Sequence, residues 1–177
     1  WWWQRPRVFA PTCSPPLIDP RVFATTAAGL WCREANGALV FRDWQGEECW
    51  RITPPPHRTR DWPPRLAAAL RAQLDRATAQ HVSPDGNALL TVRMADGPAL
   101  RVQVWRKGEA VNNVMVPIDA PFRPEDSDFC MMNRGRAVIA LAGERACEVF
   151  SIKGSAVTRG SIPYPVDDEA GGTPALP

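Results

Sequence analysis

Short apolar runs rich in β-branched residues alternate with turn residues along most of the chain. The clearest example is SPDGNALLTVRMADGPALRVQVWRKGE, residues 83–109, in which two apolar runs lie between three turns. Proline fixes φ, aspartate caps a turn through its side chain, and glycine adopts the left-handed conformation, so SPDG, ADGP and RKGE all suit tight turns. The pattern predicts antiparallel strands joined by short turns.

A pattern of four short strands occurs three times, which predicts three four-stranded antiparallel sheets. The predicted strands are residues 22–26, 30–34, 39–43 and 49–53 in the first copy, 80–82, 88–94, 100–105 and 111–116 in the second, and 129–132, 137–141, 147–152 and 157–162 in the third. The copies align on the glycine that follows each third strand, namely Gly46, Gly108 and Gly154. In the first copy Asn36 and Gly37 also favour a two-residue hairpin turn.

One segment between the first and second copies has helical instead of strand periodicity. Leu66, Leu70 and Leu74 are four residues apart and follow prolines that suit a first helical turn, which predicts a helix over residues 63–79. Its removal makes the spacings between the aligned glycines nearly equal, so we interpret it as an insertion.

The predicted helix has an apolar and a basic face. We expect the leucines to pack against the nearest sheet, because an amphipathic helix buries its apolar face. Arg65, Arg71 and Arg76 lie off that face and are candidate contacts to an acidic surface of a partner protein.

These repeats, with SPDG before one strand and an aromatic residue near the end of the next, resemble the blades of WD-repeat and TolB-like β-propellers over residues 21–165. The blades are degenerate, since Trp105 is followed by Arg106 and Phe150 by Ser151 instead of aspartate. The resemblance implies an all-β fold of about three four-stranded antiparallel propeller-like blades with one inserted α-helix. Propellers close with four to eight blades, so it also implies a fragment of a larger ring or assembly with a second copy.

Composition narrows the classes of function. Nineteen prolines in 177 residues argue against a helical bundle, and 45% hydrophobic residues argue against a wholly disordered chain. With 21 basic and 19 acidic residues and no long run of like charges, nucleic acid is not expected as a partner.

Candidate chemistry is sparse, and we predict no catalytic, cofactor or metal site. His81, Ser83 and Asp85 lie within one tight turn, which cannot arrange a catalytic triad. The acidic segment RPEDSD, residues 123–128, lacks the glycine and closing glutamate of a calcium loop and is predicted to be a solvated loop.

The five cysteines are odd in number and contain no CxxC pair, which indicates neither a disulfide framework nor a zinc site. They are Cys13, Cys32, Cys49, Cys130 and Cys147, of which four lie in apolar runs and are expected to be buried thiols. Thiols favour a reducing compartment such as the cytoplasm. The alternative is an exported protein with a Cys32–Cys49 or Cys130–Cys147 bridge.

Both ends of the chain differ from the repeats. Residues 1–20 form a linker rich in tryptophan and proline, and WWWQRPR resembles the interfacial edge of a membrane helix, which would lie upstream of Trp1. The alternative is that the tryptophans pack on the domain itself. Residues 166–177 are predicted to be a disordered tail.

The sequence therefore predicts a non-catalytic binding or scaffold module that mediates protein–protein interaction, because repeats of this kind make wide, rigid surfaces. Two alternatives stay open. The chain is the propeller of a larger hydrolase of the prolyl-oligopeptidase type, whose catalytic domain lies elsewhere, or the extramembrane sensor arm of a membrane-anchored signalling protein.

Overall fold

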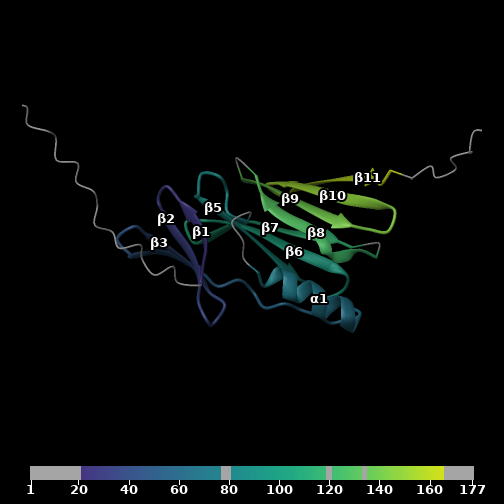
Figure 1. Ribbon diagram of the computed structural model, residues 1–177, viewed down its shortest axis with the longest axis horizontal. Coiled ribbons are helices and arrows are strands. Elements are labelled where there is room, and N and C mark those ends of the chain that lie inside the picture. The colour runs from purple at the N-terminus through teal and green to yellow at the C-terminus, as the bar shows by residue number, and fades with distance from the viewer. Residues whose placement is uncertain (1–20, 77–80, 119–120, 133–134, 166–177) are drawn as a thin grey trace, which may run out of the picture.

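The computed structural model describes residues 21–76, 81–118, 121–132 and 135–165, and within them the chain is mostly β. Its elements form three antiparallel meanders (Figure 1). Sheet A contains β1 (Val22–Thr26), β2 (Gly29–Arg33), β3 (Leu39–Asp43) and β4 (Glu48–Ile52), sheet B contains β5 (Ala88–Met94), β6 (Ala99–Arg106) and β7 (Glu109–Pro117), and sheet C contains β8 (Arg123–Met131), β9 (Arg136–Ala142), β10 (Ala146–Lys153) and β11 (Ala156–Pro163).

Two predictions about the strands are corrected. Within the described ranges sheet B has three strands instead of four, because of the predicted strand over residues 80–82 only Val82 forms a bridge, with Leu89, and residue 80 lies outside the described residues. The predicted loop over residues 123–128 is part of β8. Its pairing with β9 shifts between Arg123 and Asp128, and there the Ser127 hydroxyl donates to the Arg123 carbonyl at 2.7 Å, which keeps Ser127 buried and leaves the acidic side chains exposed.

The inserted helix, α1 (Pro64–Leu74), ends earlier than predicted. Arg93 of β5 donates to the Leu74 carbonyl at 3.2 Å and so satisfies one of the free carbonyls at the helix end. Residues 77–79 of the predicted helix lie outside the described residues, as do the predicted linker over residues 1–20 and the predicted tail over residues 166–177.

The apolar face of α1 packs on the sheets, as expected. Ala67, Leu70 and Leu74 are buried, Leu66 is partly buried, and the helix contacts β5 and β8. Because β5 and β8 are edge strands of sheets B and C, the helix covers edges that would otherwise be open to pairing with another chain.

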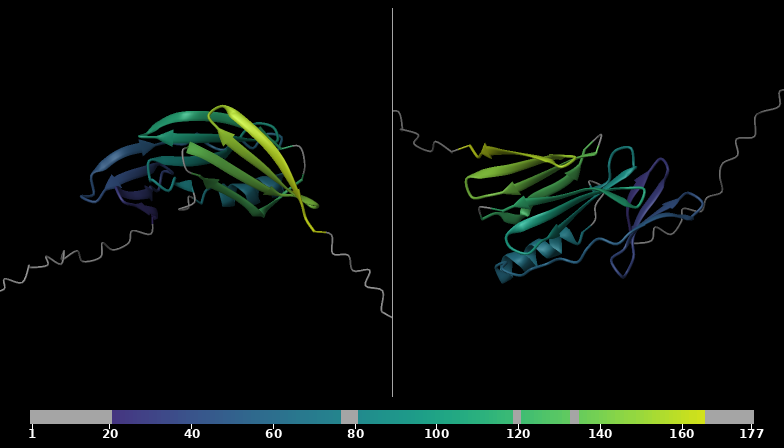
Figure 2. Two further views of the ribbon diagram at one scale, coloured as in Figure 1. Left: turned by 90° about the horizontal axis from the view of Figure 1, so that it is seen from above. Right: turned by 180° about the vertical axis from the view of Figure 1, so that it is seen from behind.

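The three sheets stack in chain order, with sheet B between the other two (Figure 2). Successive side chains of a strand point to opposite faces, so Leu89 of β5 packs with sheet A, whereas Leu90 packs with sheet C. The A–B contact is aromatic, with Trp31, Phe41 and Trp50 in one cluster. The B–C contact is mainly aliphatic and includes α1.

The three glycines used to align the copies occupy equivalent turns. Gly46 follows β3, Gly108 follows β6 and Gly154 follows β10, and their φ angles are 87°, 82° and 60°. Such angles are readily adopted only by glycine. Each of the three glycines lies in the turn before the last strand of its sheet, and the wider repeat alignment stays a prediction.

The outer faces of the stack differ in charge. On sheet A, Arg51 contacts Glu34 at 2.6 Å and Glu48 at 2.7 Å, and Arg42 lies 3.7 Å from Glu48. The middle of the outer face of sheet C instead carries small uncharged residues of intermediate exposure. These are Cys130, Val138, Ala140 and Val149.

The four described cysteines form no disulfide, so neither of the two alternative bridges is present. Cys32, Cys130 and Cys147 are of intermediate exposure and Cys49 is exposed, which corrects the expectation of buried thiols. For Cys130 the reason is its register, because it pairs with Val138 on the outward face of sheet C, where both side chains are of intermediate exposure.

The SPDG turn before β5 packs against sheet A, and this contact leads to a prediction for Gly86. Its φ is 74°, and an added Cβ would lie 2.6 Å from Cβ of Thr26. Gly37 has a similar φ of 85° but no atom within 4 Å of its added Cβ. We expect Gly86→Ala to lower the free energy of unfolding by about 2–5 kcal/mol and Gly37→Ala by about 1–2 kcal/mol, as measured by urea denaturation. Equal losses of unfolding free energy in Gly86→Ala and Gly37→Ala would show that the turn does not contact sheet A tightly.

Candidate functional site

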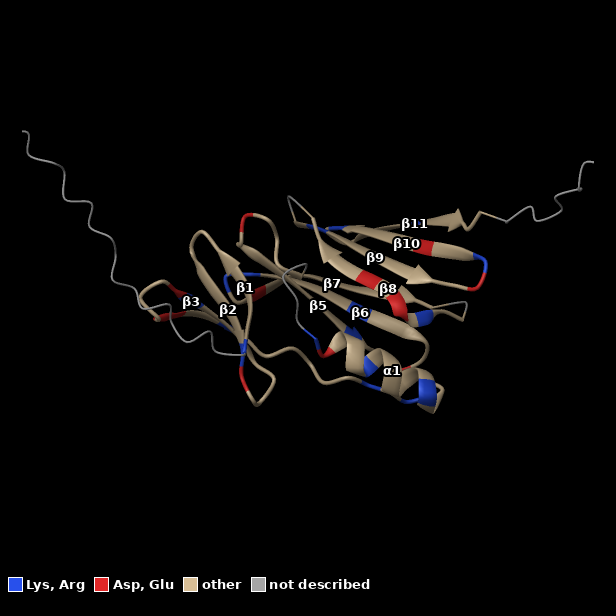
Figure 3. Cartoon of the chain, viewed as in Figure 1, with Lys and Arg blue, Asp and Glu red and all other residues tan. Residues whose placement is uncertain are grey.

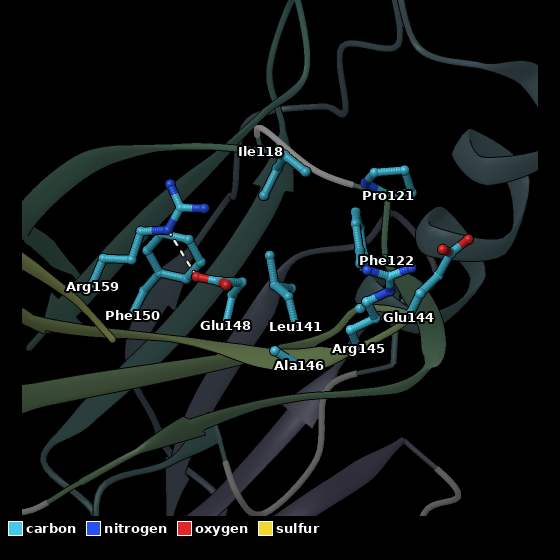
Figure 4. A pocket seen from close by; sticks show the side chains of 11 residues that line it. Ile118, Pro121, Phe122, Leu141, Glu144, Arg145, Ala146, Glu148, Phe150 and Arg159 are labelled. Carbon is cyan, nitrogen blue, oxygen red and sulfur yellow. Dashed lines mark hydrogen bonds and ion pairs between the residues drawn. The ribbon is translucent and has the colours of Figure 1, made fainter. Parts of the chain in front are cut away.

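A pocket of about 260 Å³ opens between sheets B and C near the β9–β10 turn (Figure 4). Its floor is apolar and consists of Ile118, Phe122, Leu141 and Phe150, all of which are buried. Leu141 and Phe150 point toward sheet B because alternate residues of β9 and β10 face it. The connection between β7 and β8 contributes Ile118 and Phe122 on the other side.

An ion pair lies at one side of the pocket. Arg159 of β11 pairs with Phe150 of β10, and its guanidinium carbon lies 5.6 Å from the centroid of the Phe150 ring. Its Nε donates to Oε2 of Glu148 at 2.9 Å. This hydrogen bond, with a second one from Ser161, holds the pKa of Glu148 below its usual value. The pair therefore fixes Arg159 over the ring as a wall of the pocket.

The opposite side of the mouth carries Glu144 and Arg145, which lie near Phe122 in Figure 4. The rim thus has two acidic and two basic side chains around an apolar floor. Such a pocket suits a ligand segment in which an apolar side chain is flanked by polar residues. Burial of the apolar side chain on the floor is favourable, and a flanking charge of either sign can pair with a side chain at the rim.

Nothing that lines this pocket is a serine, cysteine or histidine. Within the described ranges no group of three or more histidine, cysteine, aspartate or glutamate side chains could hold a metal ion.

The residues His81, Ser83 and Asp85 form a capped turn, as the sequence indicates. The Ser83 hydroxyl donates to Oδ1 of Asp85 and accepts from the amide of Ala88 at 2.9 Å. Asp85 also accepts from the amide of Asn87 at 3.2 Å. These contacts are structural.

A half-buried histidine that sequence reasoning did not single out, His57, links α1 to sheet B. His57 accepts from the amide of Met94 at 3.0 Å through Nδ1, and its Nε2 lies 3.2 Å from Oδ1 of Asp75. Desolvation, followed by the nearby Arg93, lowers the pKa of His57. Both ring nitrogens are engaged, so His57 serves to position the end of the helix.

The three predicted partner-binding arginines are exposed but do not form one cluster. Arg65 lies in the first turn of α1 and Arg76 lies beyond its last residue, so their backbones are separated by about 16 Å along the helix direction. Arg71 lies between them, with Nε 3.7 Å from Oδ2 of Asp75. Arg76 lines a different hollow, next to sheet A.

The chain matches no protein-family model, no curated protein matches it, and no solved structure matches its fold. Of the helices in the described ranges, none combines the length and apolar character needed to cross a membrane.

Proposed function

We propose that this chain is a non-catalytic binding module that recognises a partner protein through a segment carrying an apolar side chain. The observation that supports this most directly is the pocket between sheets B and C, with its buried apolar floor and its fixed Glu148–Arg159 wall. A pocket that is already formed in the free chain needs little ordering on binding, which favours recognition of short peptide segments.

We further propose that the stack is built from β-propeller-like blades. Three features favour this: each sheet is an antiparallel meander, the sheets stack face to face in chain order, and the turn after β3, β6 and β10 contains a left-handed glycine. In such an arrangement loops from successive sheets present one continuous surface.

The experiment that tests the binding proposal is selection of peptides from a random display library on the whole chain. Ala146 lines the pocket, so Ala146→Trp fills it, while Ala156→Trp places the same side chain at the exposed start of β11. We expect the selected peptides to share an aromatic or branched aliphatic residue. Their affinity falls at least about tenfold with Ala146→Trp and is unchanged with Ala156→Trp.

Two results would contradict the proposal. One is a selection that enriches no peptide above the background of an unrelated protein. The other is enriched peptides that bind both tryptophan variants as tightly as the original chain, which would place recognition away from this pocket.

A further inference from the structure

Sheet B is one strand narrower than the sheets on either side of it. Within the described residues sheets A and C have four strands each, whereas sheet B ends at β7, which pairs only with β6. Sheet C extends further, because β11 follows β10 and all of its residues are exposed. Val157 of β11 pairs with the buried Ile152 of β10 and so points toward sheet B, yet it is 37% exposed. The position beside β7, where a fourth strand of sheet B would lie, is therefore left uncovered by the described part of the chain.

Two hollows lie at opposite ends of β7, and both are bounded by sheet C. One is the pocket of Figure 4, which Ile118 lines just after β7. The other has a volume of about 230 Å³, and Asn112 lines it near the start of β7. Ala146 lines the first hollow and Lys153 the second, so β10 runs from one to the other. The two hollows thus mark the ends of the position beside β7, and at about 3.4 Å per residue they are about 20 Å apart.

The backbone of β7 is suited to accept a further strand. The Ile118 amide donates to the Pro98 carbonyl at 2.7 Å, so the backbone groups of Ile118 point toward β6. Because this direction alternates along a strand, the N–H and C=O groups of Asn113 and Met115 point away from β6. Pairing with β6 is regular over this part of β7, since the register shift lies closer to its start. An extended segment can form backbone hydrogen bonds with these groups.

The hollow near the start of β7 is basic. Arg106 and Lys153 line it, and none of the described residues in its lining carries a carboxylate. Glu109 pairs with Arg106 in the β6–β7 hairpin, and Arg136 pairs with Lys153, so basic groups still outnumber acidic ones. Figure 3 shows basic residues at this end of sheet C, which carries the β10–β11 turn, and both signs of charge at the β9–β10 turn. An acidic side chain on a bound segment would complement the basic end.

We propose that the partner segment binds as a fourth strand of sheet B, antiparallel to β7 as all strand pairs in the three sheets are. The inference rests on the proposed function, because the apolar side chain of the segment occupies the pocket of Figure 4. Asn112 and Ile118 line the two hollows and are separated by an even number of positions, so both face sheet C. The segment therefore carries an acidic residue about six positions after its apolar residue.

The test starts from a library of random peptides of about twelve residues, which are long enough to span β7 at about 3.4 Å per residue. Peptides selected on the whole chain are synthesised and titrated by calorimetry. We expect them to carry the apolar and the acidic residue in that order and at that spacing. N-methylation of peptide residues whose N–H groups face β7 weakens binding at least about tenfold, whereas N-methylation of the residues between them changes it less than about threefold. A segment held by its side chains alone does not produce this alternation.

Variants of β7 test the same contact from the other side. Met115→Pro removes an N–H group that points away from β6, a change that an edge strand tolerates, and we expect at least about tenfold weaker binding. Met115→Thr keeps that N–H group and is the matched control, with an affinity within about threefold of the original chain. If Met115→Pro fails to fold, the alternation along the peptide still decides. We also expect hydrogen exchange of the Asn113 and Met115 amides to be fast in the free chain and at least about tenfold slower in the complex.

The outcomes separate this inference from the proposed function. Peptides that are weakened by Ala146→Trp but not by Met115→Pro, and that show no alternation, would overturn the added strand and leave the pocket in place. Peptides that are weakened by Met115→Pro but not by Ala146→Trp would support the added strand and contradict recognition in the pocket. Slow exchange of both amides without peptide would overturn the added partner strand, because a second copy or another part of this chain then occupies the position. A library that yields no binder would overturn both.

Discussion

Replacement of Trp31 by alanine is expected to lower the free energy of unfolding by about 3–5 kcal/mol. Trp31 is 1% exposed and lies at the centre of the A–B contact, with the rings of Phe41 and Trp50 at centroid distances of 5.3 Å and 6.4 Å. Its Nε1 also donates to the Gly86 carbonyl at 3.4 Å. The substitution leaves a cavity in the small core that joins sheet A to sheet B.

The measurement is urea denaturation combined with hydrogen exchange. We expect the amides of β2 and β3 to lose protection while those of sheet C keep it, because sheet C packs on the other face of sheet B. Trp44→Ala is the control: Trp44 is 56% exposed and contacts the rest of the chain through a hydrogen bond to the Ala27 carbonyl at 2.9 Å. We expect Trp44→Ala to lower the free energy of unfolding by less than about 1 kcal/mol. Similar losses of unfolding free energy in Trp31→Ala and Trp44→Ala would show that the packing of Trp31 does not determine the stability of sheet A.

Acidification is expected to destabilise the chain through His81. Burial lowers the pKa of His81 from 6.5 to about 4, against the opposing effect of Asp128 and with added repulsion from Arg33 and Arg93. The unfolded chain therefore takes up a proton at a higher pH than the folded chain. This contribution to stability is complete at pH 7 and is lost as the pH falls from about 6.5 to about 4, amounting to about 3 kcal/mol.

The variant that isolates this effect is His81→Leu, which cannot titrate. We expect the difference in unfolding free energy between the variant and the original chain to shift by about 3 kcal/mol in favour of the variant between pH 7 and pH 4. Other titrating groups, His57 included, are common to both proteins and cancel in the difference. Parallel pH profiles would show that His81 titrates alike in the folded and unfolded chains.

Strands with strong local signals were predicted closely, while those that depend on tertiary contacts were not. The residues of β1, β3 and β5 agree with the predicted bounds because apolar runs and flanking turn residues mark both ends. β8 was predicted to start at residue 129 but starts at Arg123. Its first half is acidic and becomes a strand only because Ser127 is buried against β9, as shown by the hydrogen bond from the Ala142 amide at 3.1 Å.

Neither the pocket between sheets B and C nor the hollow next to sheet A was predicted from the sequence, because each depends on how sheets and helix meet. Glu148 and Phe150 are two residues apart on β10, a spacing that indicates one face, but only the register of β11 brings Arg159 to them. Arg76 was singled out as a helix residue, whereas its position beside Arg33 depends on the packing of α1 near sheet A.

The outer faces of sheets A and C differ in how readily a further sheet could pack on them. A sheet added against sheet A would have to strip water from the network of Arg42, Glu48, Arg51 and Glu34, and desolvated ion pairs rarely recover that cost. One added against the middle of sheet C would cover mainly thiol, methyl and isopropyl groups, those of Cys130, Val138, Ala140 and Val149. We therefore expect a sheet added by tandem fusion to pack more readily on sheet C than on sheet A, so the fusion should be joined after β11.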